Sequence, residues 1–104
     1  MHAKLTIAAA LLLHAVHAQP ITVTLVDKAA AAPVRNRPVA FVQEIRCVRA
    51  PCPPLPAGAG KTGPNGELTI PDKIRRNATH LSVPGYRPVP LPAKSGKLEL
   101  LPAT

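Results

Sequence analysis

Apolar and polar residues alternate in several short windows of this chain. A period of two is typical of β-strands with one buried face. In a strict alternation the apolar residues share one side of the strand and can pack on a common core. Four windows fit this pattern, namely ITVTL (21–25), ELTI (67–70), THLSV (79–83) and KLEL (97–100).

Residues 38–46, PVAFVQEIR, predict a further strand because they combine β-branched and aromatic residues. The sequence leaves the register of this strand open. Either Val39 and Phe41 or Ala40 and Val42 can face inward.

Residues 87–92, RPVPLP, place a proline at every second position. Each proline lacks the backbone N–H that a strand inside a sheet donates, so this strand must lie at an edge. Prolines on an edge also discourage pairing with other chains.

Helical signals are nearly absent, because 14 prolines interrupt the chain. Residues 50–66 are rich in proline and glycine and predict a loop, and residues 72–77 predict a basic connection. The strand pattern predicts a small antiparallel Greek-key β-sandwich of six to seven strands. The expected core includes Leu25, Phe41, Ile70, Leu81, Val83 and Leu100.

Residues 1–18 have the features of a signal peptide. Lys4 gives a positive start, residues 5–13 are apolar but too few to span a bilayer, and Val16 and Ala18 are small residues at the cleavage positions. Cleavage before Gln19 leaves a single domain, residues 19–104, with no second apolar run of membrane-spanning length. We therefore expect an exported protein of the bacterial periplasm or the extracellular space.

Four stretches resemble the carboxypeptidase regulatory-like domains, which have a prealbumin-like (transthyretin-like) fold. They are ITVTLVDKAAAAPVRNRPVAF, KTGPNGELTIP, THLSVPGYRPVPL and KLELLP, and the residues that match the family pattern are Thr62, Gly66, Leu68, Ile70, Gly85 and Tyr86. These positions are turns and core residues, so the resemblance implies a fold rather than a ligand. Arg37 and the long cysteine loop depart from the pattern.

The same fold includes the hydroxyisourate hydrolases, which carry a C-terminal Tyr-Arg-Gly-Ser motif and active-site histidines. This chain ends in Leu-Leu-Pro-Ala-Thr and keeps only His80 after signal cleavage. The resemblance therefore implies a module without that activity.

The two cysteines, Cys47 and Cys52, flank a short proline-rich segment. Their spacing suits half a zinc site, with His80 as a third ligand, or a redox pair. Export to an oxidising compartment favours a disulfide. Such a ring would present Val48 and Arg49 on a stiff loop, so both are candidate binding residues.

This loop either only closes a long hairpin or recognises a partner. A preorganised loop loses less entropy on binding, and arginine is frequent at interface hot spots. One specific alternative is a secreted peptidase inhibitor in which Arg49 enters the acidic pocket of a trypsin-like enzyme. Pro51 lies close to the bond that such an enzyme would cleave.

Catalytic motifs are weak. His80 and Ser82 share the outward face of one strand, and Asp27 or Asp72 could complete a triad, but no nucleophile elbow surrounds Ser82. The run GAGKT at 58–62 lacks the first glycine of a phosphate loop and precedes a turn rather than a helix. We predict no catalytic residues, no cofactor and no metal.

The formal net charge is +8. Lys73, Arg75 and Arg76 form the densest basic group and are further candidate binding residues. No aromatic residues interleave with them, so nucleic acid is not the expected partner. An anionic envelope surface or a protein is expected instead, and the sequence does not specify the oligomeric state.

Overall fold

The computed structural model describes residues 20–45, 47–48 and 52–103. The signal peptide prediction lies outside these residues, as does Arg49. The described chain forms nine elements in the order β1 (Ile21–Asp27), β2 (Ala32–Pro33), β3 (Pro38–Gln43), β4 (Leu55–Lys61), β5 (Glu67–Ile70), α2 (Asp72–Asn77), β6 (His80–Ser82), β7 (Val89–Pro90) and β8 (Gly96–Leu100).

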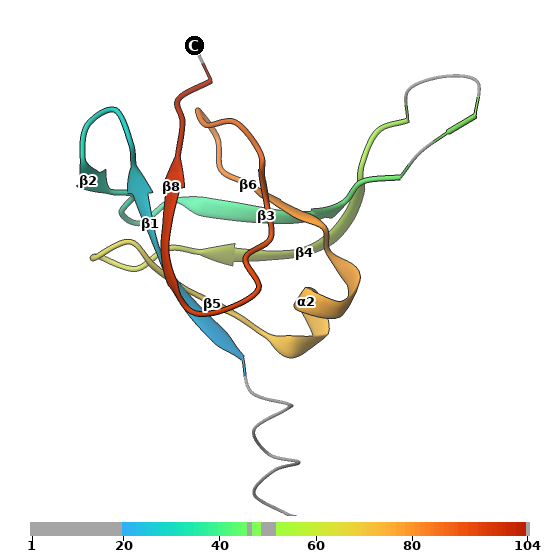
Figure 1. The fold of residues 1–104 in the computed structure, drawn as a ribbon, viewed down its shortest axis with the longest axis horizontal. Helices are drawn as coiled ribbons and strands as arrows, with labels where there is room; N and C mark the ends of the chain where they lie inside the picture. Colours follow the sequence, from blue (N-terminus) through green and yellow to red (C-terminus); the bar gives the residue numbers. More distant parts are fainter. Residues whose placement is uncertain (1–19, 46, 49–51, 104) are drawn as a thin grey trace, which may run out of the picture.

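The strands form two four-stranded sheets (Figure 1). In one sheet β1 pairs antiparallel with β2 and β5, and in the other the order is β4-β3-β6-β7 with every pair antiparallel. The predicted all-β architecture is confirmed. One detail differs, since β8 pairs with β1 in parallel over Val23–Asp27. The last strand, β8, thus lies beside the first strand, β1.

The core lies between the two sheets and is aliphatic apart from one ring. All six residues expected in the core are buried, and Val39 and Phe41 settle the register of β3 by facing inward. The buried hydrophobic residues are Ile21, Val23, Leu25, Val34, Val39, Phe41, Leu68, Ile70, Ala78, Leu81, Val83 and Leu100.

β4 corrects the prediction of a loop over residues 50–66. Its glycines are used as small inward-facing residues. A Cβ at Gly60 would lie 3.2 Å from Leu68 Cδ1 and 3.4 Å from Phe41 Cε2, and one at Gly58 would lie 2.8 Å from Ile74 Cδ1. The large residues of neighbouring elements fill the space that side chains on β4 would otherwise occupy, so this strand has no apolar alternation.

α2 is a second correction, because residues 72–77 were expected to be a basic connection. Six residues are too few to show a helical period. Arg76 Nε lies 3.2 Å from Asp72 Oδ2, an ion pair of the kind that supports one helical turn. Ile74 packs against the core, so this single apolar residue holds the helix in place.

The proline-rich strand lies where the sequence predicted. β7 is the last strand of its sheet and pairs only with β6, through His80↔Pro90 and Leu81↔Val89. This prediction is confirmed.

Candidate functional site

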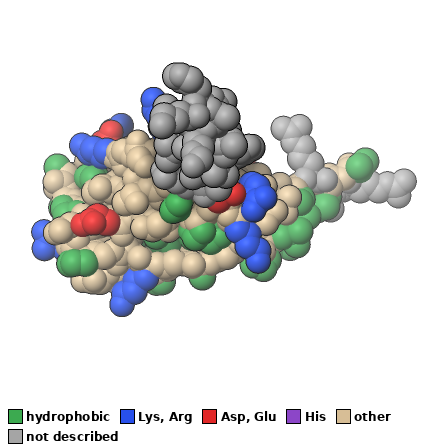
Figure 2. Space-filling view, turned by 90° about the horizontal axis from the view of Figure 1, so that it is seen from below, with side chains coloured by type: hydrophobic (Ala, Val, Ile, Leu, Met, Phe, Trp, Pro, Cys, Tyr) green, Lys and Arg blue, Asp and Glu red, His purple; other side chains and the backbone are tan. Residues whose placement is uncertain are grey.

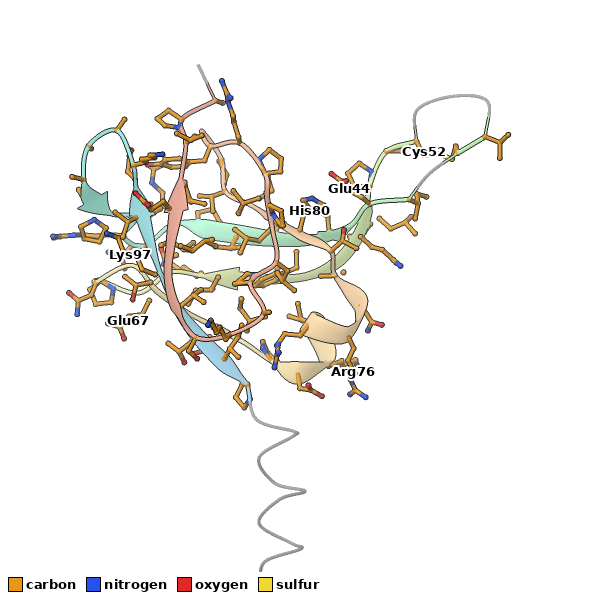
Figure 3. The ribbon with its side chains drawn as sticks, viewed as in Figure 1. Glu44, Cys52, Glu67, Arg76, His80 and Lys97 are labelled. Atoms are coloured by element: carbon orange, nitrogen blue, oxygen red, sulfur yellow. A yellow bond between two sulfur atoms is a disulfide. The ribbon has the colours of Figure 1, made fainter. Side chains whose placement is uncertain are left out.

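The described residues of the connection between β3 and β4, namely 44–45, 47–48 and 52–54, form an arm that extends from the sandwich. We call these residues the β3–β4 arm. Cys47 and Cys52 form a disulfide in it, with their Cα atoms 5.9 Å apart, so the predicted disulfide is confirmed. Figure 1 shows that the arm leaves the same end of the sandwich as α2, and Cys52 lies well away from the sheets in Figure 3.

Exposed apolar side chains concentrate on this arm and at its base. Val48 is 101% exposed, which means that nothing described in the structure covers it. Ile45 on the arm is 39% exposed, and Leu55, where β4 begins, is 47% exposed. Figure 2 shows hydrophobic side chains gathered toward this end of the molecule, beside lysine and arginine side chains.

Thr79 fixes the base of the arm. Its hydroxyl accepts a hydrogen bond from the Glu44 backbone N–H at 2.8 Å, and its own N–H donates to the Val42 carbonyl at 2.9 Å. His80 Nδ1 lies 2.9 Å from the same hydroxyl and 3.8 Å from Glu44 Oε2 (Figure 3). Sequence reasoning missed the roles of Thr79 and Glu44, because nothing local marks a threonine that bonds to a residue 35 positions away.

The basic candidates lie on α2, next to a shallow pocket. Arg75 Nη2 donates to the Ala93 carbonyl at 3.0 Å, which holds its guanidinium over that pocket. Lys73 lies on the exposed side of the same helix. The pocket has a volume of about 320 Å³ and is lined by Asp72, Arg75, Arg76, Ala78, Thr79, Leu91, Pro92 and Ala93.

The structure therefore brings the described candidates to one end of the molecule. Val48 lies on the arm, and Lys73, Arg75 and Arg76 lie on the helix that shares that end (Figure 1). Arg49 lies outside the described residues. A contact at this end can combine an apolar side chain on a closed loop with the positive charge of α2.

The triad considered from the sequence is not assembled. Asp72 pairs with Arg76. Asp27 lies on β1 in the other sheet, where its carboxylate accepts hydrogen bonds from the Ala30 N–H at 2.9 Å and from the Tyr86 hydroxyl at 2.8 Å. The carboxylate that lies beside His80 is that of Glu44, 3.8 Å from Nδ1.

The Asp27–Tyr86 contact predicts a pH dependence of stability. The Ala30 N–H, and after it the Tyr86 hydroxyl, lower the pKa of Asp27 by favouring its charged form. A lowered folded pKa stabilises the fold above the ordinary carboxyl range near about pH 4, and this stabilisation is lost as the pH falls through the folded pKa. Thermal unfolding of D27N should therefore show a lower Tm than the unsubstituted protein at neutral pH, with the difference shrinking in acid.

The same contact raises the pKa of Tyr86, chiefly because its hydroxyl donates to Asp27 and secondarily because of burial. Its contribution is present below the ordinary tyrosine range and is lost as the pH rises through the raised pKa. Y86F is the matched variant, since it removes only the hydroxyl. A Tm difference between D27N and the unsubstituted protein that stays constant from neutral to strongly acidic pH would contradict this account.

Reduction of the disulfide is expected to leave the sandwich folded. A ring of this size stabilises a protein by roughly 2 kcal/mol through the entropy of the unfolded chain, and the sheet pairings and the core lie outside the arm. Far-UV circular dichroism should keep its β-sheet signal in the reduced protein and in the C47S/C52S variant, with a modest fall in Tm. Loss of that signal on reduction would contradict the prediction.

Within residues 20–45, 47–48 and 52–103, no three His, Cys, Asp or Glu side chains are grouped to hold a metal ion. The same part of the chain contains no helix that is long and apolar enough to cross a membrane. Comparison of the chain with protein-family models, curated proteins and solved structures finds no match.

Proposed function

We propose that this chain is an exported, non-enzymatic binding or accessory module of the cell envelope, of the carboxypeptidase regulatory-like type. Three features support this proposal. The sequence begins with the features of a signal peptide, the disulfide suits an oxidising compartment, and two sheets pack as a sandwich. The proposed family rests on the resemblance to carboxypeptidase regulatory-like domains at turn and core residues such as Gly66 and Tyr86.

The full exposure of Val48 on the disulfide-closed arm is the observation that carries the proposal. A valine that contributes nothing to the core gains stabilisation only when a partner covers it, by about 1.5–3 kcal/mol for full burial. The disulfide limits the conformations of the loop before binding, so less entropy is lost on binding. Thr79 fixes the base of the arm, which further limits its movement.

The basic side chains of α2 favour an anionic partner. Positive charge beside a contact speeds association and selects against basic partners more than it adds affinity. Exposed charges of this kind contribute about 1 kcal/mol or less each. Lys73, Arg75 and Arg76 should therefore act together and weakly, while Val48 acts as an individual contact.

Retention of envelope proteins by the immobilised processed chain (residues 19–104) tests the proposal. V48S should weaken retention about tenfold, since it removes most of the apolar contact. L101S is the matched control, because Leu101 is another exposed apolar residue, 45% exposed, and lies outside the arm. Equal retention by V48S and by the unsubstituted chain would contradict a role for the arm.

The dependence of binding on salt separates the contribution of the basic side chains of α2 from that of Val48. Raising the ionic strength from about 0.05 to about 0.5 M shortens the Debye length from roughly 14 to roughly 4 Å. The K73Q/R75Q/R76Q variant should bind more weakly at low salt and become equal to the unsubstituted chain at high salt. R35Q is the control, since Arg35 follows β2 at the other end of the sandwich (Figure 1).

The peptidase-inhibitor function is the second candidate, favoured by the Cys47–Cys52 disulfide and by the position of Cys52 away from the sheets (Figure 3). Its test is direct. Stoichiometric inhibition of a trypsin-like peptidase by the protein, with loss of inhibition in R49A, would support the inhibitor function in place of an envelope-binding function. Unchanged peptidase activity with excess protein would eliminate this candidate.

A further inference from the structure

The free edges of the two sheets differ in how they are protected. β7 is protected by Pro88, Pro90 and Pro92, β8 carries Lys97 and Glu99, and β5, which pairs only with β1, begins with Glu67. Natural sheets block unwanted strand pairing with such residues. β4 also contains Pro56, Lys61 and an irregularity opposite Phe41 and Val42, but its middle, residues 57–60, is Ala-Gly-Ala-Gly and contains neither a proline nor a charge.

The ladder between β3 and β4 shows which backbone groups of β4 point away from β3. Thr62 N–H donates to the Arg37 carbonyl at 2.9 Å, and hydrogen-bonded pairs alternate along an antiparallel ladder. Along the register from Thr62, the pair Gly60↔Val39 is therefore hydrogen-bonded. The pairs Lys61↔Pro38 and Ala59↔Ala40 are not hydrogen-bonded. The N–H and C=O groups of Ala59 and Lys61 therefore point toward the open edge.

These outward groups are accessible. Ala59 and Lys61 are exposed, and no hydrogen bond joins their backbone to another element within the part of the chain that the structure describes. Gly58 and Gly60 face the core. Over residues 58–60 the only side chain on β4 is therefore the methyl group of Ala59, so little bulk hinders an incoming strand there.

We propose that β4 binds an extended acidic segment of a partner protein, which adds a strand to the sheet. Addition of a strand to an exposed edge is a recurring way to bind peptides, in which main-chain hydrogen bonds supply affinity. The proposal rests on the proposed function, since it takes the partner to be a protein. It adds a second contact beside the arm, because β4 begins where the arm ends.

Charge decides between an acidic segment and a second copy of this chain. The chain carries a formal net charge of +8, so pairing two copies brings like charges together. Lys61 lies on β4 itself, and α2, with Lys73, Arg75 and Arg76, contacts β4 where Ile74 meets Gly58. An acidic extended segment on β4 would meet Lys61 and lie near the helix that carries the other three charges.

Amide hydrogen exchange of the processed chain, measured by NMR, tests the inference. In the free protein the amides of Gly60 and Thr62 should exchange slowly and those of Ala59 and Lys61 quickly. An end-blocked five-residue peptide of alternating glutamate and valine should slow exchange at Ala59 and Lys61 by at least about tenfold, as expected for amides that gain a hydrogen bond. It should leave Gly60 and Thr62 unchanged.

Two control peptides and one variant sharpen the test. A peptide with lysine in place of glutamate, and one with N-methyl groups on the bonding edge, should give no protection. A59P removes an N–H that points outward, so it should abolish protection while keeping the β-sheet dichroism. If A59P fails to fold, the N-methylated peptide still decides.

Absence of protection with the acidic peptide would overturn the inference. Slow exchange at Ala59 and Lys61 in the free protein, with a dimer in light scattering, would also overturn it in favour of a second copy. V48S should bind the peptide normally, because Val48 is on the arm. Retention of envelope proteins that depends on Val48, without peptide protection, would therefore reject only the strand addition and keep the proposed function.

Discussion

Replacing Gly66 with alanine is expected to destabilise the sandwich more than any other single methyl group added to a glycine of this chain. Gly66 has a φ of +82°, in the left-handed region that residues with a Cβ disfavour. An added Cβ would lie 2.7 Å from the Leu25 carbonyl oxygen and 3.1 Å from Pro33 Cβ. The Gly66 carbonyl accepts the Leu25 N–H at 2.8 Å, so the turn cannot move away without breaking that bond.

The left-handed conformation alone costs about 1–2 kcal/mol for a residue with a side chain. The contact with a backbone oxygen adds to this cost, because backbone on β1 cannot rotate aside as a side chain can. We expect G66A to lower the free energy of unfolding by about 3 kcal/mol, a large fraction of the stability of a small domain. Urea unfolding followed by far-UV dichroism measures the loss.

Two other glycines separate the dihedral cost from the contact. Gly85 has a φ of +89° with nothing within 4 Å of an added Cβ, so G85A should cost only about 1–2 kcal/mol. Gly63 has only the Glu67 carbonyl nearby, at 3.8 Å, and G63A should cost less than about 1 kcal/mol. Equal losses for G66A and G85A would show that the contact with Leu25 is relieved at little cost.

The strands that the sequence predicted correctly are those whose inward residues are large. β1, β5 and β8 each place valine, leucine or isoleucine toward the core at every second position, with Leu98 of β8 only partly buried, and this period is visible in the sequence alone. The core side of β4 is filled instead by residues of other elements. Phe41, Leu68 and Ile74 occupy that space, so a strand of alanine and glycine satisfies the fold while it resembles a loop.

The short helix was missed for a related reason. A helix of six residues needs only the partly buried Ile74 as an anchor, and a single apolar residue among Asp72, Lys73, Arg75 and Arg76 shows no helical period. The parallel pairing of β8 with β1 is likewise a property of the topology, which alternation within a strand cannot specify. Which strands pair, and in which direction, depends on the path of the chain between the two sheets.

The candidate site was predictable in its chemistry but not in its placement. The cysteine pair and the signal for export to an oxidising compartment predicted a closed loop, and the structure confirms the disulfide and shows Val48 exposed. That α2 and the arm share one end follows only from the fold (Figure 1). The hydrogen bond that joins Glu44 to Thr79 across 35 residues had no signal in the sequence.

Truncation of Phe41 is expected to have the other largest effect on stability. Phe41 is 1% exposed and is the largest fully buried side chain. Large-to-small substitution of a buried phenylalanine typically costs 3–5 kcal/mol, roughly, because it leaves a cavity. F41A should therefore leave the domain partly or wholly unfolded at 25 °C, and F41L should remain folded with a smaller loss.

The position of the ring beneath β4 makes a sharper prediction. A Cβ at Gly60 would lie 3.4 Å from Phe41 Cε2 and 3.9 Å from Phe41 Cζ, so G60A overpacks the core next to the ring. Overpacking of this kind costs about 1–3 kcal/mol. In the F41L background the smaller side chain frees room for the added methyl group, and G60A should cost less there.

A double-mutant cycle of F41L and G60A, measured by urea unfolding, should thus give a favourable coupling of about 0.5 kcal/mol or more. V39A is a matched background, since Val39 is also buried on β3 and pairs directly with Gly60, but no atom of Val39 is among the three nearest to the added Cβ. The coupling of G60A with V39A should be smaller. Strict additivity of F41L and G60A would mean that Leu68, at 3.2 Å, rather than the Phe41 ring, excludes larger residues from this position.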